Sequence, residues 1–165
     1  MSYRVVVERN RLRFAAGHFA TLANELEPIH GHNYDVIIEA TGSLTEAAWV
    51  IDFSQLKKVG REICEMLDHK FLLQMKSSTL IVTDEQSHFK IQFNNQPSYR
   101  LPKTDVIALP IDNTTAERLA EFIAGILLKK LEKSICERLT LLKVGVEEMP
   151  GQVGWFETIP TVSGE

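Results

Sequence analysis

The stretch Glu27-Pro28-Ile29-His30-Gly31-His32-Asn33-Tyr34 leads directly into a segment that predicts a β-strand over residues 33–42. In this segment Tyr34, Val36 and Ile38 alternate with Asp35, Ile37 and Glu39, so that apolar residues recur at every second position. A period of two is the signature of a strand with one buried face. Because side chains two residues apart on a strand share a face, His30 and His32 point the same way if the strand includes them.

A third histidine closes the preceding run, Arg11-Leu12-Arg13-Phe14-Ala15-Ala16-Gly17-His18. We predict a first strand over residues 3–14, with His18 beyond its end on the apolar face of the run. Three imidazoles that converge from neighbouring strands can hold a divalent metal and leave one coordination position open. Neutral imidazoles suit zinc, so the sequence predicts a Zn²⁺ site of His18, His30 and His32.

Two helices are expected further along the chain. Asp52 can cap the first, with Gln55 at the return position, and its apolar stripe is Leu56, Val59, Ile63, Met66 and Leu67. The second begins at a capping box, Thr114-Thr115-Ala116-Glu117. Its predicted buried face is Leu119, Phe122, Ile123, Ile126, Leu127 and Leu131.

Two final strands, residues 140–148 and 153–158, are joined by the turn Met149-Pro150-Gly151-Gln152. Residues 73–110 form a predicted β insertion or extended meander. The chain is therefore expected to be one domain, residues 1–165, of the α+β class, with an antiparallel four-stranded sheet and two helices on one face. The bare sheet edges predict a homo-oligomer that joins sheets edge to edge.

Composition narrows the functional classes. The chain has 165 residues, 44% apolar, with a net charge of -4 and no run of basic residues, which argues against nucleic-acid binding. No apolar run is long enough for a membrane span, and the first residues lack the core of a signal peptide. Cys64 and Cys136 both fall in helical patterns, so we expect free thiols, with Cys64 in the core, and a cytoplasmic setting.

Several acidic residues could perform chemistry beside the histidines. Glu27 precedes His30 by three residues and could act as a base near a bound metal, whereas its rival Glu25 is expected to face solvent. Asp68 and His69 are either an ordinary helix end or a carboxylate that orients an imidazole for proton transfer. Glu148 shares the apolar face of Val144 and Val146, which favours either an ion pair with an arginine or a ligand rich in N–H groups.

The order of these motifs resembles the family of 6-pyruvoyltetrahydropterin and 6-carboxytetrahydropterin synthases. The similar motifs are Phe14-x-Ala16-x-His18, His30-Gly31-His32-Asn33-Tyr34, Asp52-Phe53-x-x-Leu56-Lys57, Leu67-Asp68-His69-Lys70, Thr114-Thr115-Ala116-Glu117-x-Leu119-Ala120 and Val146-x-Glu148. The resemblance implies a tunnelling fold (T-fold) that closes into an oligomeric barrel, commonly a hexamer of two trimers. It also implies zinc on His18, His30 and His32, and a pterin derived from 7,8-dihydroneopterin triphosphate bound between subunits.

By the same resemblance, Glu148 would hold the pterin ring with Thr114 or Thr115, and Asp68 and His69 would form a proton-transfer pair. Typical members carry a catalytic cysteine shortly before His-Gly-His, and this chain has Glu27 instead. That looks like the subgroup that cleaves the pterin side chain to 6-hydroxymethyl-7,8-dihydropterin for folate synthesis. Two alternatives remain open: formation of 6-pyruvoyl- or 6-carboxytetrahydropterin, for biopterin or queuosine (deazapurine) synthesis, and a pterin-binding oligomer without catalysis.

Overall fold

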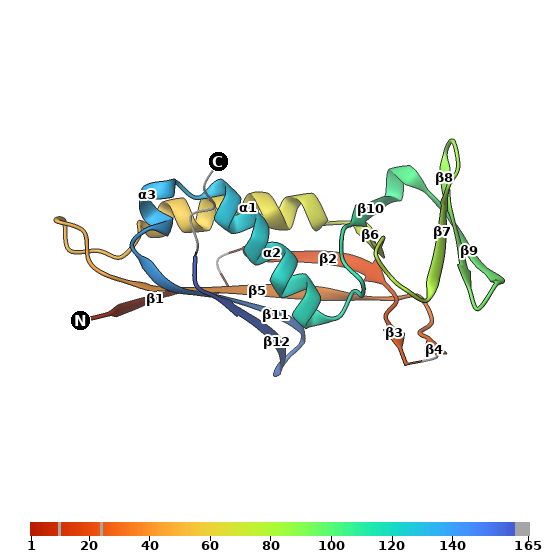
Figure 1. Ribbon diagram of the computed structural model, residues 1–165, viewed down its shortest axis with the longest axis horizontal. Coiled ribbons are helices and arrows are strands. Elements are labelled where there is room, and N and C mark those ends of the chain that lie inside the picture. Colours follow the sequence, from red (N-terminus) through yellow and green to blue (C-terminus); the bar gives the residue numbers. More distant parts are fainter. Residues whose placement is uncertain (10, 24, 161–165) are drawn as a thin grey trace.

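The computed structural model of the chain describes residues 1–9, 11–23 and 25–160. One large mixed sheet has the strand order β10-β6-β2-β5-β11-β12, and β1 also pairs with β5 (Figure 1). Its strands are β1 (Tyr3–Val7), β2 (Arg13–His18), β5 (His30–Gly42), β6 (Lys70–Gln74), β10 (Val106–Leu109), β11 (Leu139–Met149) and β12 (Gln152–Thr158). The helices α1 (Phe53–Leu67), α2 (Ala116–Lys130) and the short α3 (Lys133–Cys136) cover one face of the sheet. The predicted α+β class with helices on one face is confirmed.

The predicted strand over residues 3–14 is wrong, because the chain turns between two separate strands. β1 and β2 both pair antiparallel with β5, β1 from Tyr3↔Gly42 onward and β2 from Arg13↔Asp35 to His18↔His30. Arg9 and Arg11 between them have positive φ values of 60° and 62°, which interrupts the extended backbone. The turn lets one long strand, β5, support both.

The sheet also has more strands than the four expected, and it is not wholly antiparallel. β6 runs parallel to both β2 and β10. These two short strands lie at the ends of the predicted insertion, so the insertion leaves the sheet through β6 and returns through β10. Its remainder is the expected β meander, a three-stranded antiparallel sheet of β7 (Leu80–Asp84), β8 (His88–Phe93) and β9 (Gln96–Pro102), followed by the 3-10 turn η1 (Lys103–Asp105).

The helix starts were predicted with mixed success. Asp52 caps α1 by accepting a hydrogen bond from the Ser54 backbone N–H at 2.7 Å, whereas Gln55 does not return to Asp52 and lies 3.5 Å from Glu132. At α2 the cap residue is Thr115, but its side chain makes no capping hydrogen bond, so the predicted capping box does not form. Met66 also differs from the prediction, since it is exposed.

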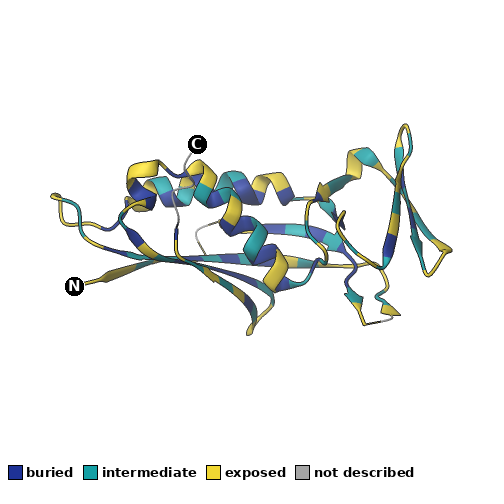
Figure 2. Cartoon of the chain, viewed as in Figure 1, coloured by how far each residue is buried: buried dark blue, intermediate teal, exposed yellow. Residues whose placement is uncertain are grey.

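The main hydrophobic core lies between the sheet and the helices. Figure 2 shows that buried residues alternate along β5 and β11 and follow the inner sides of α1 and α2. Leu12, Tyr34, Ile38, Leu119 and Val144 are among its fully buried side chains. No helix in residues 1–9, 11–23 and 25–160 is long and apolar enough to cross a membrane.

The N-terminus of α2 approaches β12 so closely that only glycine fits between them. A Cβ atom added to Gly154 would lie 2.6 Å from the backbone nitrogen of Glu117 and 2.7 Å from the Cβ of Ala116. Thr114, which directly precedes the first residues of α2, contacts His18. The close packing of α2 on β12 therefore also helps to place the residue that orients this histidine.

We predict that Gly154→Ala lowers the free energy of unfolding by about 1–3 kcal/mol, because the helix must move away from the strand. Gly125→Ala is the matched control, since a Cβ there meets nothing within 4 Å and alanine favours the helix by about 0.5–1 kcal/mol. Urea titration measures both. Equal stability of the two variants would contradict the close approach.

Candidate active site

The structure brings the three predicted histidines together on the helix-facing side of β2 and β5. The strand register places His18 opposite His30 and Ala16 opposite His32. The potential ligand nitrogens of the three imidazoles all lie within 4.8 Å of one another. His18 is buried, His32 is half-buried and His30 is exposed, so the cluster is anchored in the core and opens to solvent at one side.

Backbone carbonyls orient two of the rings. His18 Nδ1 lies 3.1 Å from the Thr114 carbonyl oxygen, and His30 Nδ1 lies 2.9 Å from the Pro28 carbonyl oxygen. Because a carbonyl oxygen only accepts, each Nδ1 donates to it, which leaves Nε2 of each ring as the nitrogen that can bind a cation. This arrangement, with the second nitrogen held by the protein, is typical of histidine metal ligands.

The Nε2 nitrogens of these two rings face each other. The Nε2 atoms of His18 and His30 are 3.1 Å apart, close to the roughly 3.4 Å expected between two nitrogens bound to one tetrahedral zinc. Burial, followed by the nearby His30 and His32, lowers the pKa of His18 to about 4. Burial and His30 also lower the pKa of His32. Three imidazoles whose ligand nitrogens converge in this way could hold a divalent cation.

Glu27 stands beside this cluster on the short hairpin of β3 (Thr21–Leu22) and β4 (Glu25–Leu26). Its backbone N–H donates to the Ala20 carbonyl at 3.0 Å, and its Oε2 accepts from the Ala20 N–H at 3.0 Å. Glu27 is half-buried, whereas Glu25 is exposed, as predicted. The double contact with Ala20 fixes the carboxylate with respect to β2.

A cavity of about 380 Å³ joins Glu27 to other predicted residues. Its lining includes His18, Glu27, His30, Thr115, Glu117 and Glu148. Burial raises the pKa of Glu148, and the charges of Glu117 and Glu27 raise it further. Glu148 lies near the end of β11, where the pairing with β12 shifts register, and it lines the cavity together with Glu27, Glu117 and His30. We name this space the Glu27 cavity.

The two threonines have different positions. Thr115 lines the Glu27 cavity, whereas Thr114 is fully buried. Thr114 Oγ1 lies 2.8 Å from the Phe19 carbonyl oxygen and 3.0 Å from Gln74 Oε1, and its own carbonyl holds His18. Thr114 therefore orients His18 in the histidine cluster, which leaves Thr115 as the threonine that a ligand could touch.

Sequence reasoning missed three residues that build this site. Glu117 was assigned only to a helix cap, yet it lines the Glu27 cavity. Gln74 is fully buried and contacts Thr114, and Asn113 binds both the N–H and the carbonyl of Thr21. The sequence carries a signal for two of them, because Asn113 directly precedes the Thr114-Thr115 pair and Glu117 follows it by two residues.

Asp68 and His69 form a pair at the end of α1. Asp68 Oδ1 accepts from the Ala15 N–H at 2.7 Å, and Oδ2 lies 2.7 Å from His69 Nδ1. The Ala15 N–H, followed by His69, holds the pKa of Asp68 below its usual range, although partial burial opposes this. His69 has a positive φ of 55° and donates its backbone N–H to the Ala15 carbonyl. The backbone of His69 is therefore in the left-handed region, and its side chain is 84% exposed to solvent.

This pair opens to a different cavity. A second space of about 570 Å³ is lined by His30, His32, His69, Lys70 and Asp105, among others, but not by Glu27 or Glu148. His30 lines both cavities. Within one chain the structure therefore brings Glu27 together with Glu148, His18 and His30, and it leaves Asp68 and His69 at a different cavity.

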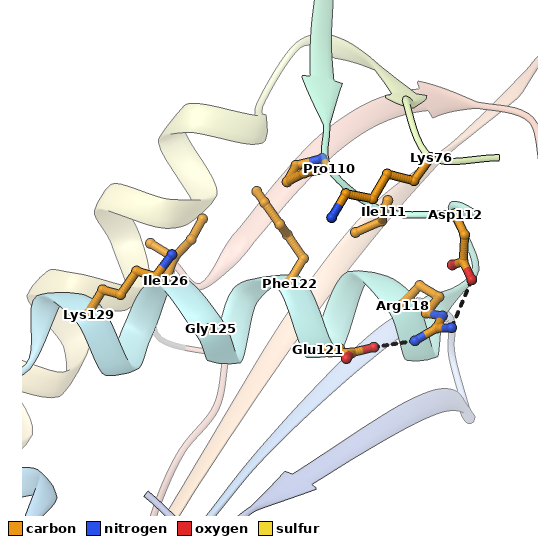
Figure 3. Close-up of a pocket in the computed structure, with 10 residues that line it drawn as sticks. All are labelled: Lys76, Pro110, Ile111, Asp112, Arg118, Glu121, Phe122, Gly125, Ile126 and Lys129. Atoms are coloured by element: carbon orange, nitrogen blue, oxygen red, sulfur yellow. Dashed lines mark hydrogen bonds and ion pairs between the residues drawn. The ribbon is translucent and has the colours of Figure 1, made fainter. Parts of the chain in front are cut away.

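A third cavity, of about 390 Å³, lies along α2 (Figure 3). Phe122 and Ile111 form part of its wall, and Arg118 pairs with Asp112 and Glu121 at one end. It contains none of the residues that the sequence analysis assigned to chemistry. We assign it no part in the active site.

The two cysteines are remote from this chemistry. Cys64 lies on α1 and Cys136 on α3, and both are buried and free, as expected. Burial raises the pKa of the Cys64 thiol to about 12, so it is protonated at neutral pH. Neither cysteine lines the Glu27 cavity. A carboxylate, that of Glu27, lines this cavity with His18 and His30.

Comparisons with known proteins agree with this geometry. The sequence profile of the 6-pyruvoyl tetrahydropterin synthase family matches residues 8–158. A protein of Methanocaldococcus jannaschii assigned as a 6-carboxy-5,6,7,8-tetrahydropterin synthase is 33% identical over 144 residues, 86% of each chain. A protein of Pyrococcus abyssi with the same assignment is 30% identical over 153 residues, 89% of each chain.

Solved structures agree as well. The 6-pyruvoyltetrahydropterin synthase of Plasmodium vivax superposes with a TM-score of 0.91 at 29% identity, covering 96% of this chain and 99% of that one. A form of the Plasmodium vivax enzyme in which alanine replaces a catalytic glutamate has a TM-score of 0.90 at 28% identity, with 96% and 99% coverage. The fold is thus that of the pterin synthases with a T-fold. This chain belongs to the 6-pyruvoyl tetrahydropterin synthase family.

We predict that His30→Ala reduces the bound metal from about one ion per chain to a small fraction, because two imidazoles cannot replace a three-histidine site. His88→Ala is the matched control, since His88 lies on the insertion at the start of β8. Elemental analysis of both purified variants measures the metal. Full occupancy in His30→Ala would show that the ligand set is different.

Proposed function

We propose that this chain is a zinc-dependent enzyme that cleaves the side chain of 7,8-dihydroneopterin triphosphate and releases 6-hydroxymethyl-7,8-dihydropterin, a step of folate synthesis. The observation that carries the proposal is Glu27, a half-buried carboxylate beside the histidine cluster, at the place where typical family members have a cysteine. The Plasmodium vivax relative, whose catalytic residue is a glutamate, supports a glutamate-dependent reaction on this fold.

Zinc on His18, His30 and His32 would act as a Lewis acid toward the side-chain hydroxyls of the substrate. Glu27 would then accept the proton of the hydroxyl on the carbon that leaves. The carbon–carbon bond breaks in the retro-aldol sense, the electron pair moves into the dihydropterin ring system, and the leaving carbon becomes a carbonyl. Glu27 suits this role because both bonds to Ala20 hold it in a fixed position next to the cluster.

The ring-side carbon must receive a proton to complete the product. We assign this step to His69, oriented by Asp68 Oδ2 at 2.7 Å. Since His69 faces another cavity than Glu27 within one chain, the proposed site combines Glu27 of one subunit with Asp68 and His69 of a neighbour. This requires a homo-oligomer, for which we propose a hexamer of two trimers joined through the sheet edges.

Glu148 and Thr115 are the proposed contacts of the pterin ring. Burial, followed by the charge of Glu117, raises the pKa of Glu148 because both destabilise its ionised form. Hydrogen bonds from N–H donors of a ligand would stabilise that ionised form. The pterin ring offers such donors on one edge. Thr115 lines the same cavity and adds a hydroxyl.

A second candidate function is the synthesis of 6-carboxytetrahydropterin for queuosine-type deazapurines. The archaeal relatives that are 30–33% identical to this chain carry that assignment. The two functions differ in their products. Incubation with 7,8-dihydroneopterin triphosphate and mass spectrometry of the pterins separates them, and 6-carboxytetrahydropterin as the main product would replace the first proposal by the second.

We predict that Glu27→Gln lowers the rate of product formation by about 10²–10⁴-fold, because the amide can still accept from Ala20 but cannot take a proton. Metal content should stay unchanged. Glu25→Gln on the same hairpin is the matched control and should remain active, since Glu25 is exposed. Unchanged turnover of Glu27→Gln would remove this residue from the mechanism.

We predict that Glu148→Gln weakens pterin binding by at least about tenfold, which corresponds to one lost hydrogen bond to a charged group. Glu147→Gln serves as the control, because Glu147 Oε1 accepts from the Gly151 N–H and an amide oxygen can do the same. Isothermal titration with 7,8-dihydroneopterin measures both. Equal affinities of the two variants would reject the role of Glu148.

A further inference from the structure

The insertion shares an apolar cluster with the segment that carries Glu27. Phe19 is fully buried in this cluster, and Leu26 packs against it from β4. The insertion and its flanking strands contribute most of the other members: Leu73, Leu80, Phe89 and Ile91, with Phe71, Val82, Phe93, Tyr99, Leu101 and Val106 partly buried around them. Figure 1 shows β3 and β4 at the same end of the molecule as β7, β8 and β9.

Phe19 and Leu26 occupy telling positions in the chain. Phe19 directly follows the histidine His18, and Leu26 directly precedes Glu27. Ala20, which forms both bonds to Glu27, is the next residue after Phe19. Phe19 and Leu26, which pack against the insertion, are therefore the direct chain neighbours of Ala20 and Glu27, whose two hydrogen bonds fix the carboxylate.

The best defined contact is an aromatic stack. The rings of Phe19 and Tyr99 on β9 have centroids 5.3 Å apart and an interplanar angle of 16°. Phe71 lies against Phe19 at 5.2 Å from another side. Such stacking restricts the rotation of Phe19, and thereby the backbone of residues 18–20.

Polar contacts hold the opposite side of the same segment. Asn113 accepts from the Thr21 N–H at 3.0 Å and donates to the Thr21 carbonyl at 2.9 Å. Thr114 Oγ1 donates to the Phe19 carbonyl at 2.8 Å. Residues 19–21 are thus held between the start of α2 on one side and aromatic side chains of β6 and the insertion on the other.

We propose that the β7–β9 sheet is a positioning element for catalysis, which fixes the Glu27 carboxylate beside the metal cluster through the stack of Tyr99 on Phe19. Tyr99 is a positioning residue that acts through Phe19 and Ala20. The proposal rests on the proposed role of Glu27 as base. The Plasmodium vivax match covers 96% of this chain, so most of the insertion has a counterpart in an enzyme with a catalytic glutamate.

The first test is independent of the reaction. Amide hydrogen exchange of Ala20 and Glu27 is measured by NMR in the zinc-loaded oligomer. Tyr99→Ala should speed exchange at both amides by about tenfold, and Tyr99→Phe should restore protection because it keeps the ring. Ile81→Ala on the exposed face of β7 is the matched control and should change neither amide. Unchanged exchange in Tyr99→Ala overturns the proposal.

The second test follows product formation from 7,8-dihydroneopterin triphosphate. Tyr99→Ala should lower kcat by about tenfold to hundredfold with KM and metal content unchanged, since a small displacement of a catalytic group is costly. In the double variant of Tyr99→Ala with Glu27→Gln, kcat should be no lower than in Glu27→Gln alone. An unchanged kcat in Tyr99→Ala, or a fully additive double variant, overturns the proposal.

The two proposals fail in different ways. If the wild-type protein releases no 6-hydroxymethyl-7,8-dihydropterin, the proposed function is wrong, and exchange at Ala20 and Glu27 still decides whether the insertion positions this carboxylate. If wild-type and Tyr99→Ala proteins make the product equally fast, the proposed function stands and the positioning role of the insertion is wrong.

Discussion

The register between β2 and β5 is the constraint on which the site depends. It sets His18 opposite His30 and leaves His32 one pair further along the same face. A slip by one residue would turn every side chain of one strand to the other face and separate the imidazoles. The core opposes such a slip, because Phe14 and Tyr34, which are paired in this register, stack with centroids 4.7 Å apart in the fully buried interior. Packing of apolar rings thus specifies the geometry of the polar cluster beside them.

The electrostatics of the Glu27 cavity favour a cation and a donor-rich ligand. Glu27, Glu117 and Glu148 line one small space, and their mutual repulsion contributes to the raised pKa of Glu148. His18 does not compensate this charge at neutral pH, because burial lowers its pKa to about 4. A divalent ion on the imidazoles and N–H groups on the carboxylates would offset both costs at once.

Local patterns predicted some parts of this structure well and failed at others for physical reasons. The alternation of Tyr34, Val36 and Ile38 located β5, and the Asp52 cap located α1, because both features depend on a few neighbouring residues. The capping box Thr114-Thr115-Ala116-Glu117 failed because the Thr114 hydroxyl bonds the Phe19 carbonyl and Gln74 instead of the helix backbone, and Thr115 makes no side-chain cap. The single strand over residues 3–14 failed because two arginines adopt positive φ values that their residue type does not favour. The parallel edge of β6 and β10 joins residues more than 30 positions apart, which no local period reports.

The sequence by itself determined the residue types of the chemistry: three histidines on two neighbouring strands, a glutamate in place of a cysteine, and the ordered motifs of the pterin synthase family. These follow from spacing along a strand and from identity of side chains, which need no knowledge of the rest of the fold. Only the tertiary structure decided which partners orient them. The contacts of Thr114 with His18 and of Tyr99 with Phe19 join segments remote in the chain. The bonds of Ala20 to Glu27 and the placement of His69 at a different cavity from Glu27 also depend on the folded chain. Their distances are set by how helices and strands pack, and packing is a property of the whole molecule.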